Sequence, residues 1–246
     1  MMVKLKPRAL IFDLGSTLIE YESVPWDELN ILCLQNARKF LKVNDYDVPE
    51  QEEFYRIFEE IKAQYRQQAA ETLVEWDVPQ ITQLFFEKLD IKYDADLIDE
   101  FFDFYYEPVD EKLYVYDDIL ETLEKLKNKY PVMGLISNTV FPERVHLQEL
   151  ARFGIEPFLN FTLFSSSFKL RKPHPDIFRK AANLAGYAPS ECVYIGDRYI
   201  EDVQGPAEVG MPAILKIVEN RTYPENMSYN IPRIKTLSDL LDILEN

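Results

Sequence analysis

The sequence predicts an α/β fold in which helices cover both faces of a parallel sheet and an all-helical segment is inserted after the first strand. Two observations lead to this prediction. From about residue 113 onward, short apolar runs alternate with amphipathic helical patterns, as in a parallel sheet whose strands are joined by helices. Glycine is absent between Gly15 and Gly134, and this part of the chain has the three- and four-residue apolar spacing of helices.

The composition is that of an ordinary globular protein of one or two domains. The 246 residues are 47% hydrophobic and 28% charged, which is enough to build a sizeable buried core. No apolar run approaches the roughly 20 residues that a membrane-spanning helix needs, and the basic N-terminus lacks the small-residue cleavage site of a signal peptide. Cys33 and Cys192 are too few for a disulfide framework. We therefore expect a cytoplasmic protein with no membrane partner.

The acidic charge is concentrated in one segment. Residues 20–110 carry 23 Asp and Glu against 8 Lys and Arg, while the whole chain has a formal net charge of −16. The ordinary interpretation is a set of solvated helix faces. A second interpretation is that the negative field of this segment repels polyanions. Both interpretations argue against a nucleic-acid partner.

The first strand is predicted at RALIFD, residues 8–13, where apolar residues run into Asp13. The glycine-free segment that follows has groups of apolar residues at helical spacing, which predict four or more helices with short polar joints: 29–40, 54–65, 81–85 and 97–102. We therefore expect an all-helical domain over residues 20–110, inserted into a discontinuous α/β domain of residues 1–19 and 111–246. The many aromatic residues of the insertion are expected to pack in its core.

Helices and strands alternate through the rest of the chain. The expected order is a helix at 117–130, a strand at 131–137, a helix at 142–154, a strand at 161–167, a helix at 175–186, a strand at 192–197, a helix at 199–210, a strand at 212–218 and a last helix from 238. Gly154 and Gly186 stand where helix ends are expected, and Pro175 stands early in its helix.

Polar residues stand at or near the expected strand ends, which is where open α/β sheets place their sites. They are Asp13 after the first strand, Ser137 and Asn138 after VMGLI, Lys172 in KLRKPHPDIF, and Asp197 and Asp202 in and after CVYIGD. Each has an ordinary explanation on its own. An aspartate at a strand end or a Gly-Asp pair makes a turn, a Ser-Asn pair caps a helix, and a lysine before a proline is usually solvated.

Together these residue types suit phosphoryl transfer. An aspartate that attacks phosphorus forms an acyl phosphate and splits one displacement into two steps. The negative phosphoryl oxygens need a lysine, a hydroxyl, backbone N–H groups and Mg²⁺ to neutralise them. Magnesium prefers hard oxygen ligands, and carboxylates at neighbouring strand ends supply them.

On these motifs the chain resembles the haloacid dehalogenase-like (HAD) hydrolase superfamily over essentially its whole length. DLGST resembles the first motif of that family, LISN the second, RKPHPDIF the third and GDRYIED the fourth. The resemblance implies a Rossmann-like parallel sheet core with an inserted helical cap domain, which closes over the site and selects substrates.

The same resemblance implies a small-molecule phosphorylated substrate, Mg²⁺ as cofactor and a role for each motif residue. The implied roles are Asp13 as nucleophile and metal ligand, Ser137 and Asn138 as phosphate binders, Lys172 as the catalytic lysine that contacts nucleophile and phosphate, and the Gly15 carbonyl with Asp197 and Asp202 as metal ligands.

Gly15 departs from the pattern of the phosphatases and mutases of this superfamily. They usually carry an aspartate two residues after the nucleophile, which protonates the leaving group and then activates water. Glycine has no side chain for either task, and general acid–base help is worth about 10²–10⁴ in rate. Three interpretations stay open: a Mg²⁺-dependent phosphomonoester hydrolase that uses another group or water as the acid, an enzyme that cleaves carbon–halogen or carbon–phosphorus bonds, and a non-catalytic binding or regulatory protein on the same fold.

Two features weigh on this choice. The retained GDRYIED favours phosphoryl transfer, because the dehalogenase branch lacks the metal-binding Gly-Asp pair and typically has tyrosine at the glycine position. The intact motif residues count against a decayed site: Asp13, Ser137, Lys172 and Asp197. Glu143 and His146 are candidate substitutes for the missing acid, although we expect each to be an ordinary surface residue of its helix.

Overall fold

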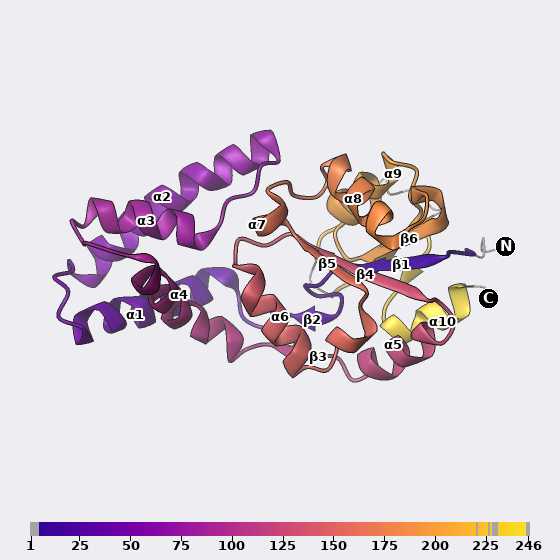
Figure 1. Ribbon diagram of the computed structural model, residues 1–246, viewed down its shortest axis with the longest axis horizontal. Coiled ribbons are helices and arrows are strands. Elements are labelled where there is room, and N and C mark those ends of the chain that lie inside the picture. Colours follow the sequence, from indigo (N-terminus) through magenta and orange to yellow (C-terminus); the bar gives the residue numbers. More distant parts are fainter. Residues whose placement is uncertain (1–4, 220, 226, 228–230, 245–246) are drawn as a thin grey trace. The chain divides into compact units, whose positions relative to one another are not determined.

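The structure is a computed structural model, and it describes residues 5–219, 221–225, 227 and 231–244. These residues divide into two compact units (Figure 1). The α/β unit comprises the described parts of 1–20, 115–139 and 143–246, and the helical unit comprises 21–114 with the short segment 140–142. The assignment of the helical unit as a substrate-selecting cap stays a prediction.

The α/β unit is built on a six-stranded sheet in the order β5-β4-β1-β6-β7-β8, with every neighbouring pair parallel. Its strands are β1 (Ala9–Phe12), β4 (Val132–Ser137), β5 (Phe161–Phe164), β6 (Cys192–Gly196), β7 (Ala213–Lys216) and β8 (Arg233–Ile234). β1 and β6 are buried along their whole length, which explains their unbroken apolar runs. The predicted α/β fold with a parallel sheet is confirmed. A second sheet pairs β2 (Ile19–Glu20) with β3 (Tyr114–Val115).

Helices cover both faces of the six-stranded sheet. They are α5 (Ile119–Lys127), α6 (Glu143–Arg152), α7 (Ser165–Phe168), α8 (Pro175–Ala185), α9 (Gly205–Ala207) and α10 (Leu240–Ile243). Figure 1 shows α8 and α9 on one face and α5 and α10 on the other. Gly154 and Gly186, just past α6 and α8, adopt φ angles of 71° and 76°. This is the left-handed region that glycine reaches without strain, as their positions in the sequence predicted.

The strand expected at 161–167 is shorter than predicted. β5 ends at Phe164, and the next four residues form the short helix α7. At Ser165 the chain is held by bonds outside the sheet ladder. The Ser165 hydroxyl accepts from the Thr139 N–H and donates to Thr139 O.

The helix expected at 199–210 is also different. The segment Tyr199–Gln204 is a π-helical turn, and α9 follows it. Within the turn, Asp202 N–H donates to Arg198 O at 2.7 Å, and Asp202 Oδ2 accepts the Arg198 N–H at 2.8 Å. The wider turn therefore fixes the direction of the Asp202 side chain.

The helical unit contains α1 (Trp26–Val43), α2 (Gln51–Thr72), α3 (Val78–Lys88) and α4 (Ala95–Asp110). Asp77 and Asp94 begin α3 and α4 by accepting main-chain N–H groups of the first turn. The core of the unit is aromatic, as predicted, and six of its phenylalanines are at most 1% exposed: Phe54, Phe58, Phe85, Phe86, Phe101 and Phe102. Several of these rings meet edge to face, the arrangement that aromatic pairs prefer.

A loop that follows β4 in sequence belongs to the helical unit. Phe141 packs against three aromatic side chains of α1 and α4, and Val140 O accepts the Val78 N–H at 2.8 Å. The chain therefore leaves the α/β unit directly after Thr139 and rejoins it at Glu143.

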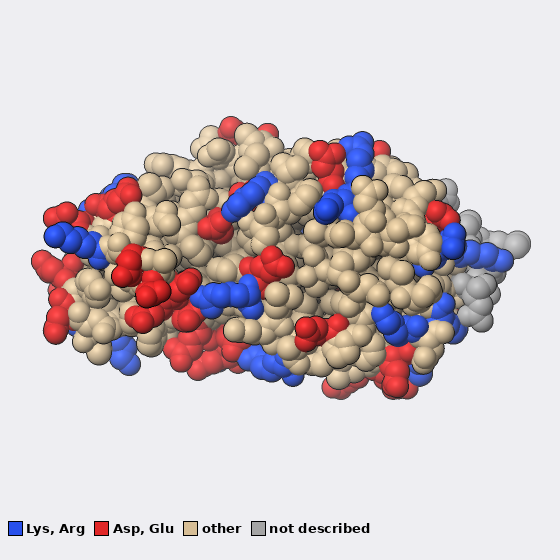
Figure 2. Space-filling model, in the orientation of Figure 1, with Lys and Arg blue, Asp and Glu red and all other residues tan. Residues whose placement is uncertain are grey.

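Acidic side chains lie on the surface of the helical unit, and Figure 2 shows them gathered there with basic side chains between them. Some of this charge is locally paired, since the exposed Arg56 contacts Glu53 at 2.6 Å and Glu60 at 2.5 Å. Within the described part of the chain, no helix has the length and apolar character that crossing a membrane requires.

Candidate active site

Three neighbouring strands bring the predicted site residues to one edge of the sheet. β1 lies between β4 and β6 and runs parallel to both. Asp13 follows β1 at the same edge as Ser137, which ends β4, and Asp197, which follows β6. All three residues are buried, and Asp13 N–H donates to Ile195 O at 2.8 Å. The position of Asp13, the predicted nucleophile, is therefore fixed by main-chain bonding to the next strand.

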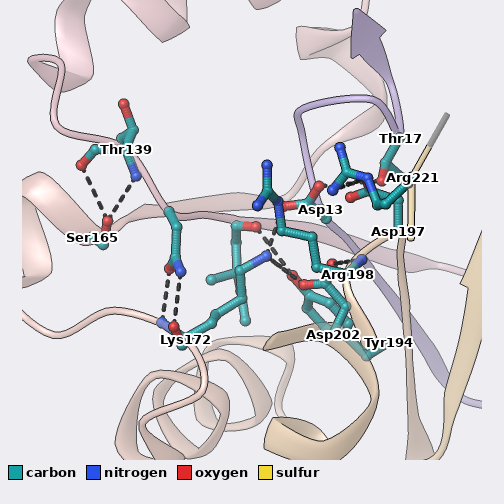
Figure 3. A network of polar contacts seen from close by, with 12 residues as sticks. Asp13, Thr17, Thr139, Ser165, Lys172, Tyr194, Asp197, Arg198, Asp202 and Arg221 are labelled. Atoms are coloured by element: carbon teal, nitrogen blue, oxygen red, sulfur yellow. Dashed lines mark hydrogen bonds and ion pairs between the residues drawn. The ribbon is translucent and has the colours of Figure 1, made fainter. Parts of the chain in front are cut away.

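Lys172 reaches this edge from the loop before α8 (Figure 3). Its Nζ donates to Asp13 Oδ1 at 2.6 Å, to Asp202 Oδ1 at 2.7 Å and to the Tyr194 hydroxyl at 2.8 Å. An ammonium group has three N–H bonds, so each has an acceptor. Burial alone lowers the pKa of Lys172, but the charges of Asp13 and Asp202 outweigh it and raise the pKa well above its usual value. Lys172 is therefore held as a cation between two carboxylates.

Asn138 holds the main chain of Lys172. Its Nδ2 donates to Lys172 O at 2.8 Å, and its Oδ1 accepts the Lys172 N–H at 2.7 Å. These two bonds tie the loop after β4 to the loop before α8. Since both ends of the amide are engaged, Asn138 positions Lys172. The direct contact of Asn138 with phosphate stays a prediction.

Tyr194, which the sequence did not single out, supports Lys172 from within β6. Its side chain is fully buried, and its hydroxyl accepts from Lys172 Nζ and donates to Ile136 O at 3.1 Å. Burial raises the pKa of Tyr194 well above its usual value, so the hydroxyl keeps its proton. It can therefore accept one hydrogen bond and donate another at the same time.

The carboxylates of Asp13, Asp197 and Asp202 form a compact buried cluster, with one oxygen of each within 4.8 Å of the others. Burial, followed by the negative charges of Asp13 and Asp202, raises the pKa of Asp197 to about 8. Burial also raises the pKa of Asp202. Asp197 Oδ2 lies 2.6 Å from Arg221 Nη1, but among the described residues neither of its oxygens accepts a hydrogen bond of normal geometry.

The turn after Asp13 is also held in place. Thr17 Oγ1 donates to Asp13 Oδ2 at 3.2 Å, so each oxygen of this carboxylate has a donor. Ser16 adopts a positive φ of 55°, and its carbonyl accepts from the buried Lys216 Nζ at 2.6 Å. Gly15 bridges to Ile19 across the same turn. Its predicted role as a carbonyl ligand to a metal is not tested by these contacts.

With this geometry established, comparison with known proteins identifies the family. Residues 7–210 match the family model described as haloacid dehalogenase-like hydrolase. The chain belongs to this family. The hydrolase is 29% identical over 155 residues to a glyceraldehyde 3-phosphate phosphatase of Methanocaldococcus jannaschii, covering 63% of this chain and 67% of the relative. It is 24% identical to a protein of the same name from Methanopyrus kandleri, over 95% of this chain and 97% of the relative.

A solved structure agrees on the fold. The hydrolase superposes on a 2-haloacid dehalogenase from Pseudomonas syringae pv. Tomato DC3000 with a TM-score of 0.71, covering 96% of this chain and 97% of the other. The two sequences are 22% identical, so the likeness concerns the fold and not the reaction.

The carboxylate cluster fits the divalent cation that the family implies. Three buried carboxylates share two cationic side chains, Lys172 and Arg221, and among the described residues the Asp197 oxygens accept no hydrogen bond of normal geometry. Like charges this close repel one another unless a cation lies between them. Hard carboxylate oxygens are also the ligands that Mg²⁺ prefers.

His146 corrects one expectation from the sequence. We expected a surface residue of its helix, but His146 is 2% exposed and hydrogen-bonds to Thr139 and Glu149. Its face of α6 also carries the buried Val145 and Leu150, so the helix turns this histidine toward the sheet. Glu143, by contrast, is half-buried and accepts from the exposed Ser167 hydroxyl.

Proposed function

We propose that this hydrolase is a Mg²⁺-dependent phosphatase of small-molecule phosphomonoesters that works through a phosphorylated Asp13. The observation that carries the proposal is the buried cluster of Asp13, Asp197 and Asp202 around Lys172. A surplus of carboxylates suits a divalent cation, and a divalent cation suits phosphoryl transfer. The relatives named glyceraldehyde 3-phosphate phosphatase support a small phosphorylated substrate.

In the first step, the Asp13 carboxylate attacks phosphorus, the bond from phosphorus to the leaving oxygen breaks, and an aspartyl phosphate forms. Lys172 Nζ, 2.6 Å from Asp13 Oδ1, holds positive charge where the phosphoryl oxygens lie in this step. Thr17 donates to the other oxygen of Asp13, so the carboxylate is oriented before the substrate arrives. The Ser137 hydroxyl, at the same edge, donates to a phosphoryl oxygen. Mg²⁺, when bound, adds positive charge beside the carboxylate and the phosphoryl group.

In the second step, water attacks the phosphorus of the aspartyl phosphate, inorganic phosphate leaves, and the Asp13 carboxylate is restored. Gly15 offers no acid for the first step and no base for the second, so the leaving oxygen takes its proton from water. The rate should therefore depend strongly on the leaving group.

This dependence gives a first prediction. Aryl and acyl phosphates should be hydrolysed faster than simple alkyl phosphates by about 10²–10⁴, which is the usual contribution of general acid–base help. Gly15→Asp should increase the rate on alkyl phosphates most, if the site has room for the carboxylate. The check is kcat/KM for p-nitrophenyl phosphate and for an alkyl phosphate in both proteins. Equal rates on the two substrate classes would contradict the proposed role of Gly15.

The proposed function itself is tested with p-nitrophenyl phosphate in the presence of Mg²⁺, in the presence of EDTA, and with Asp13→Asn. We expect Mg²⁺-dependent turnover that falls by at least about 10³-fold in Asp13→Asn, because the nucleophile is lost. Glu59→Gln in the helical unit is the control, because Glu59 pairs with Lys62 and is not part of the carboxylate cluster. Turnover of a 2-haloacid without metal, with none of the phosphate ester, would instead indicate a dehalogenase.

A further inference from the structure

Three buried polar side chains form a chain of hydrogen bonds apart from the carboxylate cluster. His146 Nε2 lies 2.7 Å from Thr139 Oγ1, and His146 Nδ1 lies 2.8 Å from Glu149 Oε2. Thr139 is 9% exposed, and His146 and Glu149 are each 2% exposed. A carboxylate and an imidazole are costly to bury unless they are hydrogen-bonded. The pairing therefore fixes all three side chains.

The hydrogen bonds of His146 follow from the chemistry of the groups. A carboxylate oxygen only accepts, so His146 Nδ1–H donates to Glu149. The Thr139 hydroxyl can either donate or accept, so it can bond Nε2 whether or not that nitrogen carries a proton. The ring also stacks on Phe164, at the end of β5, with a centroid separation of 5.1 Å and an interplanar angle of 20°. His146 is thus held at both nitrogens and on its face.

The main chain of Thr139 is held as firmly as its side chain. Thr139 N–H donates to Ser165 Oγ at 2.8 Å, and the Ser165 hydroxyl donates to Thr139 O at 3.2 Å (Figure 3). Ser165 is fully buried. Thr139 is therefore a fixed point of the chain, anchored from α6 on one side and from α7 on the other.

This fixed point directly follows Ser137 and Asn138. Asn138 bonds both main-chain groups of Lys172, so Thr139 is connected through its neighbour Asn138 to the loop that carries the lysine. In Figure 3, Thr139 and Ser165 lie apart from the carboxylate cluster, with Lys172 between. The anchored residues can therefore act on the site through the loop and not by touching the reacting atoms.

We propose that Thr139, His146 and Glu149 are positioning residues for the phosphate-binding loop after β4. They hold the Ser137 hydroxyl in place for a phosphoryl oxygen and, through Asn138, hold Lys172 beside Asp13. This inference rests on the proposed phosphomonoester hydrolysis, because that reaction gives the loop a phosphate to bind.

The sharpest test removes the Thr139 hydroxyl without changing the size of the side chain. Thr139→Val loses the bond to His146, whereas Thr139→Ser keeps it. We expect Thr139→Val to raise both KM and the Ki of inorganic phosphate about tenfold, because ground-state phosphate binding weakens when its donors are misplaced. Thr139→Ser should stay within about twofold of the wild type, since its hydroxyl still reaches Nε2. Thr82→Val is the matched control, because it makes the same change at a buried threonine of the helical unit whose hydroxyl bonds Val78 O in its own helix.

A second pair of variants tests the far end of the same chain of bonds. Glu149→Gln keeps an acceptor for His146 Nδ1–H, whereas Glu149→Met removes it at similar size. We expect the Ki of inorganic phosphate to rise about tenfold in Glu149→Met and to rise less in Glu149→Gln. This pair also covers the case in which Thr139→Val fails to fold.

Hydrogen exchange of the Lys172 amide separates this inference from the proposed function. That amide donates to Asn138, so its protection should fall in Thr139→Val and not in Thr139→Ser. If the wild type hydrolyses no phosphate ester but protection falls as expected, the proposed function fails and the positioning inference stands. If Thr139→Val loses thermal stability while phosphate Ki and Lys172 protection are unchanged, the three residues serve only the fold and the inference is overturned.

Discussion

Two buried lysines, one in each unit of this hydrolase, have opposite pKa shifts. Lys172 in the α/β unit is 2% exposed and Lys62 in the helical unit is 3% exposed. Lys62 Nζ pairs with Glu59 Oε1 at 2.6 Å, yet burial outweighs this partner and lowers the pKa of Lys62. At Lys172 the carboxylates of Asp13 and Asp202 outweigh burial and raise the pKa.

A buried lysine does not by itself mark a site. Lys62 pairs with the single carboxylate of Glu59 among the described residues, and both residues lie on α2 of the helical unit. Lys172 contacts two carboxylates of the cluster and Arg221 contacts the third, so three carboxylates share two cationic side chains and the remaining negative charge calls for a further cation. The surplus, and not the burial, distinguishes the candidate active site.

The strongest test of this comparison replaces each lysine by methionine. Lys172→Met should lower kcat/KM by at least about 10²-fold and destabilise the fold by about 3–5 kcal/mol, because it leaves buried carboxylates without their partner. Lys62→Met should leave kcat/KM within about twofold and change stability little, since Glu59 is partly exposed and can be hydrated. Urea unfolding and p-nitrophenyl phosphate kinetics measure both effects. Equal losses of kcat/KM in the two variants would contradict a special role of Lys172 in activity.

The surplus of negative charge predicts a stabilising response to metal. Adding Mg²⁺ at 100 times its dissociation constant should stabilise the fold by about 2.7 kcal/mol, which is the value for any ligand that binds only the folded state. EDTA should reverse the shift. Asp197→Asn should remove most of it, whereas Glu59→Gln should leave it unchanged. Thermal unfolding with and without Mg²⁺ measures this, and a full Mg²⁺ shift in Asp197→Asn would exclude Asp197 as a ligand.

Two buried tyrosines, one in each unit, allow the same comparison with smaller expected effects. Tyr194→Phe should cost about 1–3 kcal/mol of unfolding free energy, because Lys172 loses an acceptor and Ile136 O loses its donor. Tyr105→Phe in the helical unit should cost less, about 0.5–1.5 kcal/mol, because its hydroxyl makes a long bond of 3.4 Å to Asn30. Only Tyr194→Phe should also lower kcat. If both substitutions cost the same and neither changes kcat, Tyr194 does not support the lysine.

The sequence predicted the sheet and the strand-end residues because both follow from local patterns of apolar and polar residues. Apolar runs mark the strands, and parallel strands bring their carboxyl ends to one edge, so Asp13, Ser137 and Asp197 could be placed together in advance. Gly154 and Gly186 could be placed because helix ends favour glycine.

Other residues were missed for physical reasons. Tyr194 lies in a buried strand, where its ring fits the apolar pattern and hides its hydroxyl. Glu149 was not singled out, and His146 was named but expected at the surface. Both share the buried face of α6 with Val145 and Leu150, so helical spacing could have predicted their burial. Polar residues on a helix are normally assigned to solvent, and only a partner such as Thr139 makes their burial favourable. Thr139 is only seven residues before His146, but it lies outside α6, so helical spacing does not predict their contact.

The central claim is that Asp13 becomes phosphorylated during turnover. An acyl phosphate is reduced by borohydride, which would convert Asp13 to homoserine, so peptide mass spectrometry of enzyme quenched with borohydride during turnover reads the intermediate directly. We predict homoserine at position 13 when p-nitrophenyl phosphate and Mg²⁺ are both present, and none with EDTA or in Asp13→Asn. Steady Mg²⁺-dependent hydrolysis with an unmodified Asp13, or with the modification at another residue, would contradict the account.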